Sequence, residues 1–193
     1  ATLSNASYAS SAINTSVAGS FETFCMAYDQ EFSYNDSLTY ILANHTDDTS
    51  AGTITQLTSG VAYLYSQFAK GVIQITTGAQ DTAFQMASWA LQNSAGAPSI
   101  GSYSGAVVTA YNAYMASANA AGGQSAAGAN NYGVQVILTG YGTYSPVTGT
   151  FSTRYAQPQL YYSNVPDAGS TLVLLGVSLL GIVAFRRKYG VAK

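Results

Sequence analysis

Very few side chains of this sequence could act as nucleophiles, proton shuttles or metal ligands. The chain has one cysteine, Cys25, and one histidine, His45. One cysteine excludes an internal disulfide, and one cysteine with one histidine cannot make a zinc site of the usual kind. A Ser-His-Asp triad could use only His45, which stands in the polar stretch NHTDDTSAG and is expected in a solvated loop. We therefore expect no metal, no cofactor and no enzymatic activity.

Two short motifs hold the remaining residues of chemical interest. Phe24 and Cys25 form the pair FC, and the segment FQMASW contains Gln85 and the only tryptophan, Trp89. Positions four apart lie on one face of a helix, so Gln85 and Trp89 are expected on the same side. A cysteine beside a phenylalanine is commonly a small buried hydrophobic residue. A glutamine and a tryptophan of an amphipathic helix are commonly surface and core residues respectively.

Together the two motifs resemble the thioester domain of bacterial surface adhesins. That family has an aromatic-Cys motif on a strand and a later Gln motif, ending in a Trp-like residue, on a helix. The resemblance implies that the Cys25 thiol attacks the Gln85 side-chain amide, that ammonia leaves, and that a thioester forms. Phe24 and Trp89 would be its apolar cover. The product is an acyl electrophile that reacts with amines, such as a lysine on a partner surface.

This chemistry needs elements that hold the thiol and the amide together. A thiolate adds to an amide carbon only if it is held near attack distance, and a dry aromatic wall protects the product from water. Residues 21–34, FETFCMAYDQEFSY, alternate in part and predict a strand that carries Cys25; a loop with Asp47, Asp48 and Gly52 follows. Residues 1–20 are expected to form an extended arm or an edge strand.

Three segments have helical periodicity. Apolar residues recur at helical spacing in residues 54–71, 79–94 and 104–121, and Gly71 is the expected end of the first helix. Residues 132–144 and 149–162 predict two strands joined by the turn SPVTG. Helices enclosed by strands on both sides predict an α+β domain over residues 1–163.

The composition points away from the cytosol. Charged residues make up 7% of the chain, against about 25% in an ordinary soluble protein. Such a composition suits a protein outside the cell or a subunit of a packed assembly. Because the chain begins with Ala1, we expect that a signal peptide was cleaved. The net charge of −2 and the absence of a clustered basic face before Arg186 indicate that nucleic acid is not a partner.

The end of the chain has a different character. Residues 168–185 carry no charge, and a basic cluster follows, Arg186, Arg187 and Lys188. A helix of this length rises about 27 Å, close to the hydrocarbon thickness of a bilayer, and a basic flank stays on the cytoplasmic side. We expect one continuous hydrophobic helix that enters a membrane at least transiently.

This layout resembles the PEP-CTERM sorting signal in its VPD-type variant. The motif that carries the resemblance precedes the apolar span and consists of Val165, Pro166, Asp167, Ala168 and Gly169. The resemblance implies export by a Gram-negative bacterium, retention in the inner membrane and processing by an exosortase. Residues 164–193 are therefore expected to be a sorting and membrane segment, separate from the extracellular domain.

Two functions fit these observations. The first is a cell-surface protein that attaches covalently to an amine-bearing partner, surface or biofilm matrix through the Cys25–Gln85 thioester. The second is a structural subunit of an extracellular filament or layer, in which low charge and sixteen tyrosines serve packing between identical subunits. In the second case a retained tail would be buried in lipid or in neighbouring subunits.

Overall fold

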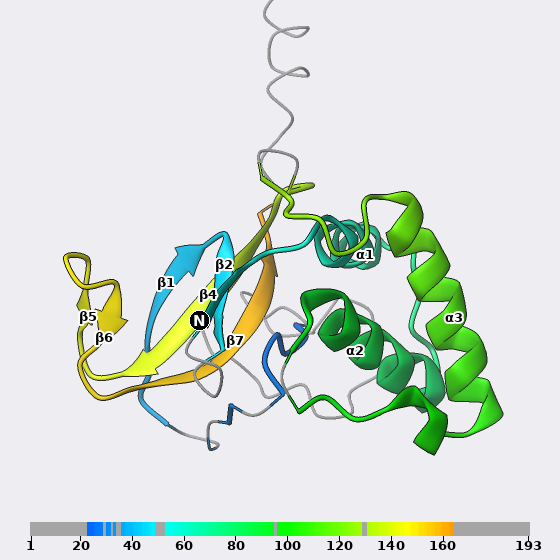
Figure 1. Cartoon of the computed structure of the whole chain (residues 1–193), viewed down its shortest axis with the longest axis horizontal. Coiled ribbons are helices and arrows are strands. Elements are labelled where there is room, and N and C mark those ends of the chain that lie inside the picture. Colours follow the sequence, from blue (N-terminus) through cyan, green and yellow to red (C-terminus); the bar gives the residue numbers. More distant parts are fainter. Residues whose placement is uncertain are drawn as a thin grey trace, which may run out of the picture. The chain divides into compact units, whose positions relative to one another are not determined.

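A computed structural model gives the structure of the chain (Figure 1). It describes residues 23–28, 30–31, 33, 36–48, 53–94, 96–128 and 131–163. The chain divides into two units, Ala1–Ser163 and Asn164–Lys193. The predicted N-terminal arm and the predicted hydrophobic helix at 168–185 lie outside the described residues.

An antiparallel sheet of three strands forms one side of the described part of the first unit. Its order is β1 (Thr39–Ala43), β4 (Val134–Tyr141) and β7 (Arg154–Tyr162). The central strand β4, VQVILTGY, is buried along most of its length, and its β-branched and aliphatic residues suit that position. A register shift between Ile137 and Thr139 marks a bulge against β7.

Two short hairpins accompany the sheet. The first pairs β2 (His45–Asp48) with β3 (Thr53–Gln56), and the second pairs β5 (Tyr144–Ser145) with β6 (Thr150–Phe151). The predicted solvated loop was therefore wrong for His45, Asp47 and Asp48, because backbone pairing with β3 makes this polar stretch a strand. The turn SPVTG is present, but it closes the small β5–β6 hairpin between β4 and β7.

Three α-helices in the described part of the chain confirm the helical predictions and the α+β class. They are α1 (Ser59–Ala69), α2 (Gly78–Gln92) and α3 (Gly105–Ala120), and a short 3-10 turn η1 (Ile100–Ser102) precedes α3. The helix α2 starts with a capping box, in which Thr77 and Gln80 satisfy each other's free backbone N–H groups. Gly71 ends the α1 segment with a φ of 73°, a conformation that glycine adopts without a steric cost.

The predicted first helix started too early. Residues 54–56 belong to β3, and α1 begins only at Ser59. Leu57 lies between the two elements and is buried, so it fits the apolar stripe of the helix without belonging to it. Periodicity alone could not separate the buried Leu57 of the connection from a first helical turn.

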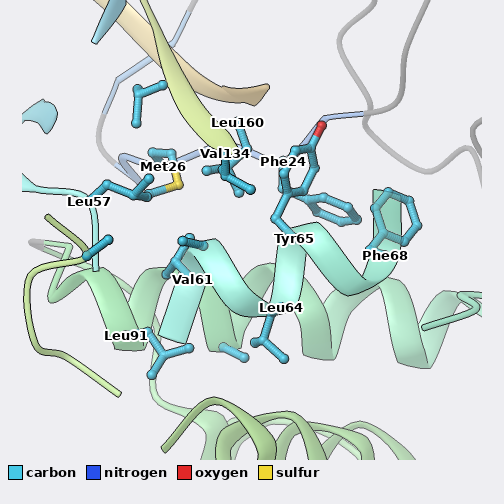
Figure 2. Packing of buried hydrophobic residues seen from close by; sticks show 14 of the residues in the cluster. Phe24, Met26, Leu57, Val61, Leu64, Tyr65, Phe68, Leu91, Val134 and Leu160 are labelled. Carbon is cyan, nitrogen blue, oxygen red and sulfur yellow. The ribbon is translucent and has the colours of Figure 1, made fainter. Parts of the chain in front are cut away.

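The hydrophobic core lies between the sheet and the helices. In Figure 1, α1 lies next to β4 and β7, and α3 packs on the outer side of α1 and α2. Figure 2 shows Val61, Leu64 and Tyr65 of α1 among Val134 of β4, Leu160 of β7 and Leu91 of α2. The helix α1 is buried around most of its circumference, which explains its strongly apolar sequence.

Candidate functional site

The segment around Cys25 lies along β7. The Met26 N–H donates to the Pro158 carbonyl at 2.9 Å, and the Leu160 N–H donates to the Phe24 carbonyl at 3.1 Å. Cys25 and Gln159 are therefore opposite each other in an antiparallel bridge. The predicted strand over residues 21–34 is reduced to this bridge among its described residues.

The register of this bridge determines where the groups of Cys25 point. In an antiparallel pair whose hydrogen bonds come from the residues on either side, the two facing residues form a non-hydrogen-bonded pair. Their side chains are then close together, while their own N–H and C=O groups point away from the partner strand. The main-chain groups of Cys25 therefore need a partner on the side opposite β7.

Gln85 of α2 supplies that partner. The Cys25 N–H donates to Gln85 Oε1 at 3.0 Å, and Gln85 Nε2 donates to the Cys25 carbonyl at 2.7 Å. One side-chain carboxamide thus satisfies both main-chain groups of the only cysteine. The two residues that the sequence motifs single out, Cys25 and Gln85, are brought together by the fold.

A second carboxamide of α2 makes the same kind of contact without a thiol. Gln92 accepts a hydrogen bond from the Thr58 N–H at 3.2 Å and donates to the Gln56 carbonyl at 2.8 Å. It holds the connection between β3 and α1 much as Gln85 holds the Cys25 segment. Gln92 is therefore a matched control for the part of Gln85's contribution that is purely structural.

The sulfur of Cys25 faces a residue that the sequence analysis missed. Gln159 Nε2 donates to Cys25 Sγ at 3.4 Å, and Gln159 Oε1 lies 4.0 Å from the same sulfur. Gln159 is only 2% exposed, which is uncommon for a glutamine. The available signal was a polar residue at an inward position of the strand YAQPQLYY, but its partner stands 134 residues earlier in the chain.

The thiol is buried, and no charged group contributes to the shift of its pKa. Burial raises the pKa of Cys25, and the hydrogen bond from Gln159 lowers it in part. Burial has this effect because a thiolate loses more solvation than a neutral thiol. At neutral pH Cys25 is therefore a protonated thiol and needs local help to become a nucleophile.

The two predicted cover residues occupy different surroundings. Phe24 points into the core, where its ring centre lies 4.5 Å from that of Phe84 and 5.2 Å from that of Phe68. Trp89 is half-buried and packs edge-to-face on Tyr28 at 4.9 Å. The Trp89 indole nitrogen is buried and has no hydrogen-bond partner among the described residues.

The described part of the chain gives little support for a metal site or for a reaction at His45. No group of three His, Cys, Asp or Glu side chains in it could hold a metal ion. His45 lies in β2, and its Nδ1 is 3.3 Å from Asn44 Oδ1. The helices within the described ranges include none that is both long and apolar enough to cross a bilayer.

Comparison with known families identifies the end of the chain. Residues 164–189 match the model of the VPDSG-CTERM motif, with Ala168 where the motif's name has serine. This motif is a sorting tail of the PEP-CTERM type, so the chain is an exported, surface-associated protein processed by an exosortase. No curated protein and no solved structure matches the chain significantly.

Proposed function

We propose that this protein attaches covalently to an amine-bearing partner or matrix at the surface of a Gram-negative bacterium, through a thioester between Cys25 and Gln85. The observation that carries the proposal is the double hydrogen bond between the Gln85 carboxamide and the Cys25 main chain. It keeps an amide carbon beside the residue that bears the only thiol. Because both groups belong to one folded domain, a reaction between them would be intramolecular.

The bond-forming step needs no reagent beyond the two side chains. Cys25 Sγ attacks the Gln85 amide carbon, the sulfur–carbon bond forms, the carbon–Nε2 bond breaks, and the thiol proton leaves with the nitrogen as ammonia. Negative charge develops on Gln85 Oε1 during the attack, and the Cys25 N–H is 3.0 Å from that atom. A backbone donor in this position stabilises the tetrahedral intermediate as an oxyanion hole does.

Capture of a partner is a second acyl transfer, from the Cys25 sulfur to an amine of the partner. The amine of the partner attacks the Gln85 acyl carbon, a stable amide forms, and Cys25 is released as a free thiol. Each molecule reacts once, so the protein is a covalent binder and not an enzyme. The partner ends up bonded to Gln85 on α2, a helix that is anchored in the core through Phe84 and Leu91.

The aromatic side chains near the motif favour a bond that survives in water. Phe24 closes the core side of the Cys25 segment, and the Trp89–Tyr28 pair covers the stretch one helical turn beyond Gln85. Exclusion of water slows hydrolysis of a reactive acyl group. Tyr28 is 42% exposed, so a partner amine has an approach that begins at the surface.

Mass spectrometry of the intact protein tests the proposal directly. We expect a mass about 17 Da below the sequence value, from the loss of ammonia, and an adduct after treatment with methylamine at pH 8. Gln85→Ala should give its full sequence mass and no adduct. Gln92→Ala, the matched control, should lose only stability and keep the bond. A full sequence mass together with an alkylatable Cys25 in the untreated native protein would refute the thioester.

A further inference from the structure

We propose that the acyl group of the thioester comes from Gln159 of β7 and not from Gln85. The inference rests on the proposed function, covalent attachment through a thioester of Cys25, and assigns the acyl carbon to a different side chain. Its basis is the position of the sulfur, because Gln159 Nε2 lies 3.4 Å and Gln159 Oε1 lies 4.0 Å from Cys25 Sγ. Gln85 instead contacts the N–H and carbonyl groups of the Cys25 main chain.

The strand register holds the sulfur beside Gln159. Cys25 and Gln159 face each other as a non-hydrogen-bonded pair, in which the two side chains lie close together on one face of the strands. The amide carbon of Gln159 joins the two atoms that contact the sulfur, so the thiol and this carbon are neighbours in the folded domain. Gln85 approaches Cys25 from the side opposite β7. An attack on the Gln85 amide would therefore require the sulfur to leave Gln159 and turn toward α2.

The Gln159 carboxamide is poorly satisfied where it lies. Its side chain is 2% exposed, and the contacts of its oxygen and nitrogen within the described part of the chain are both with the sulfur. Sulfur is a weak hydrogen-bond partner, and a buried amide without good partners costs free energy. Loss of ammonia removes the N–H donors from this position, so the reaction lowers that cost. The Gln85 carboxamide would instead lose a good hydrogen bond, the one of 2.7 Å from its Nε2 to the Cys25 carbonyl.

The bond-forming step is balanced by the two side chains alone. Cys25 Sγ attacks the Gln159 amide carbon, the sulfur–carbon bond forms, and the carbon–Nε2 bond breaks. The thiol proton passes to Nε2, the polar atom of Gln159 that lies nearest to the sulfur, and ammonia leaves. Gln85 stays intact as a positioning residue, because its two hydrogen bonds hold the main chain of Cys25 in place.

Burial also suits Gln159 to carry a reactive acyl group. The side chain of Gln159 is buried, whereas that of Gln85 is partly exposed. Exclusion of water slows the hydrolysis of a thioester, so the acyl carbon of Gln159 is the better protected of the two. After capture, the partner is bonded to β7 of the sheet and not to α2.

A tryptic peptide map of the unaltered protein tests the inference. Trypsin cleaves after Lys70 and Arg154, which places Cys25, Gln85 and Gln159 in three separate peptides. After treatment of the native protein with methylamine, the resulting N-methylamide is about 14 Da heavier than glutamine. We expect this mark at Gln159, in the third peptide. A mark at Gln85, in the second peptide, would overturn the inference and leave the proposed function intact.

Matched substitutions on β7 provide a second test. Gln159→Glu keeps the length of the side chain but has no amide, so this protein should keep its full sequence mass and incorporate no methylamine. Gln157→Glu is the control, because the Gln157 side chain donates to the Ala27 carbonyl at 3.2 Å and not to the sulfur. It should still lose ammonia, about 17 Da. Urea unfolding shows that both variants are folded, and loss of ammonia in a folded Gln159→Glu protein would contradict the assignment.

The outcomes separate the two proposals. Gln85→Ala, which keeps Gln159, should still lose ammonia, whereas it could not do so with Gln85 as the acyl donor. An unaltered protein that keeps its full sequence mass and an alkylatable Cys25 would overturn the thioester at either glutamine, and with it the proposed function.

Discussion

Replacing Cys25 with alanine is expected to abolish covalent capture of methylamine completely while the domain remains folded. The loss is total because the described residues contain no second thiol, and an amide without an attacking sulfur does not react with amines at a useful rate. The packing of one half-buried sulfur contributes on the order of 1–2 kcal/mol to the free energy of unfolding. That cost is small beside a core built from α1, β4 and β7.

Two measurements check this expectation. Intact mass after methylamine treatment reports capture, and near-UV circular dichroism with urea unfolding reports the fold. The Gln85→Ala variant is the appropriate reference for stability, since it also lacks the cross-link. Collapse of the folded signal in Cys25→Ala alone would mean that Cys25 is a core residue whose packing the domain cannot lose.

Replacing Phe24 with alanine is expected to have the largest effect on stability, about 3–5 kcal/mol. Phe24 is 4% exposed and stacks at tilted or edge-to-face angles with Phe84, Phe68 and Tyr65. The substitution leaves a cavity at the point where the Cys25 segment, β7 and the helices meet. It should also release the segment from β7, so that the sulfur no longer faces Gln159 and the Cys25 main chain no longer meets the Gln85 carboxamide.

Urea denaturation measures the first consequence, and the alkylation rate of Cys25 below the unfolding transition measures the second. Tyr28→Ala is a matched control, since Tyr28 is also aromatic and near the motif but is 42% exposed. It should cost much less stability and leave the segment in place. Equal losses for the two variants would show that Phe24 has no special anchoring role.

The helices could be predicted from the sequence because burial imposed their pattern. Four residues of α1 face apolar neighbours: Val61, Leu64, Tyr65 and Phe68. Apolar residues therefore recur at helical spacing in the sequence. The helix predicted over residues 79–94 closely matches α2, whose ends are marked by the Thr77–Gln80 capping box and the left-handed Asn93. These signals are local, so one sequence is enough to detect them.

The elements that were missed depend on distant partners. The strand β1 exposes about half of its residues, Tyr40 and Leu42 among them, and without full burial it carries no clear alternation. The β2–β3 hairpin is polar and held mainly by backbone pairing. The boundary between β3 and α1 was lost because Leu57 suits both elements.

The candidate site was half predictable for the same reason. Cys25 and Gln85 could be found because their residue types are rare or stand in a motif, and the α2 helix follows from local periodicity. Gln159 could not be found, because its role depends on a strand register that pairs Cys25 with a residue near the other end of the domain. The role of a buried polar residue depends on the residues that face it, and those neighbours follow from the fold and not from the local sequence.

The long separation between Cys25 and β7 has a consequence for when the protein can react. Contacts between residues 134 positions apart close a very large loop and form late in folding, after the local helices and hairpins. A chain that is still emerging from the ribosome or crossing a membrane as an extended polymer cannot contain the assembled pair of strands. Its sulfur therefore meets neither carboxamide in the required geometry during transit. The proposed thioester could therefore form only after the domain has folded.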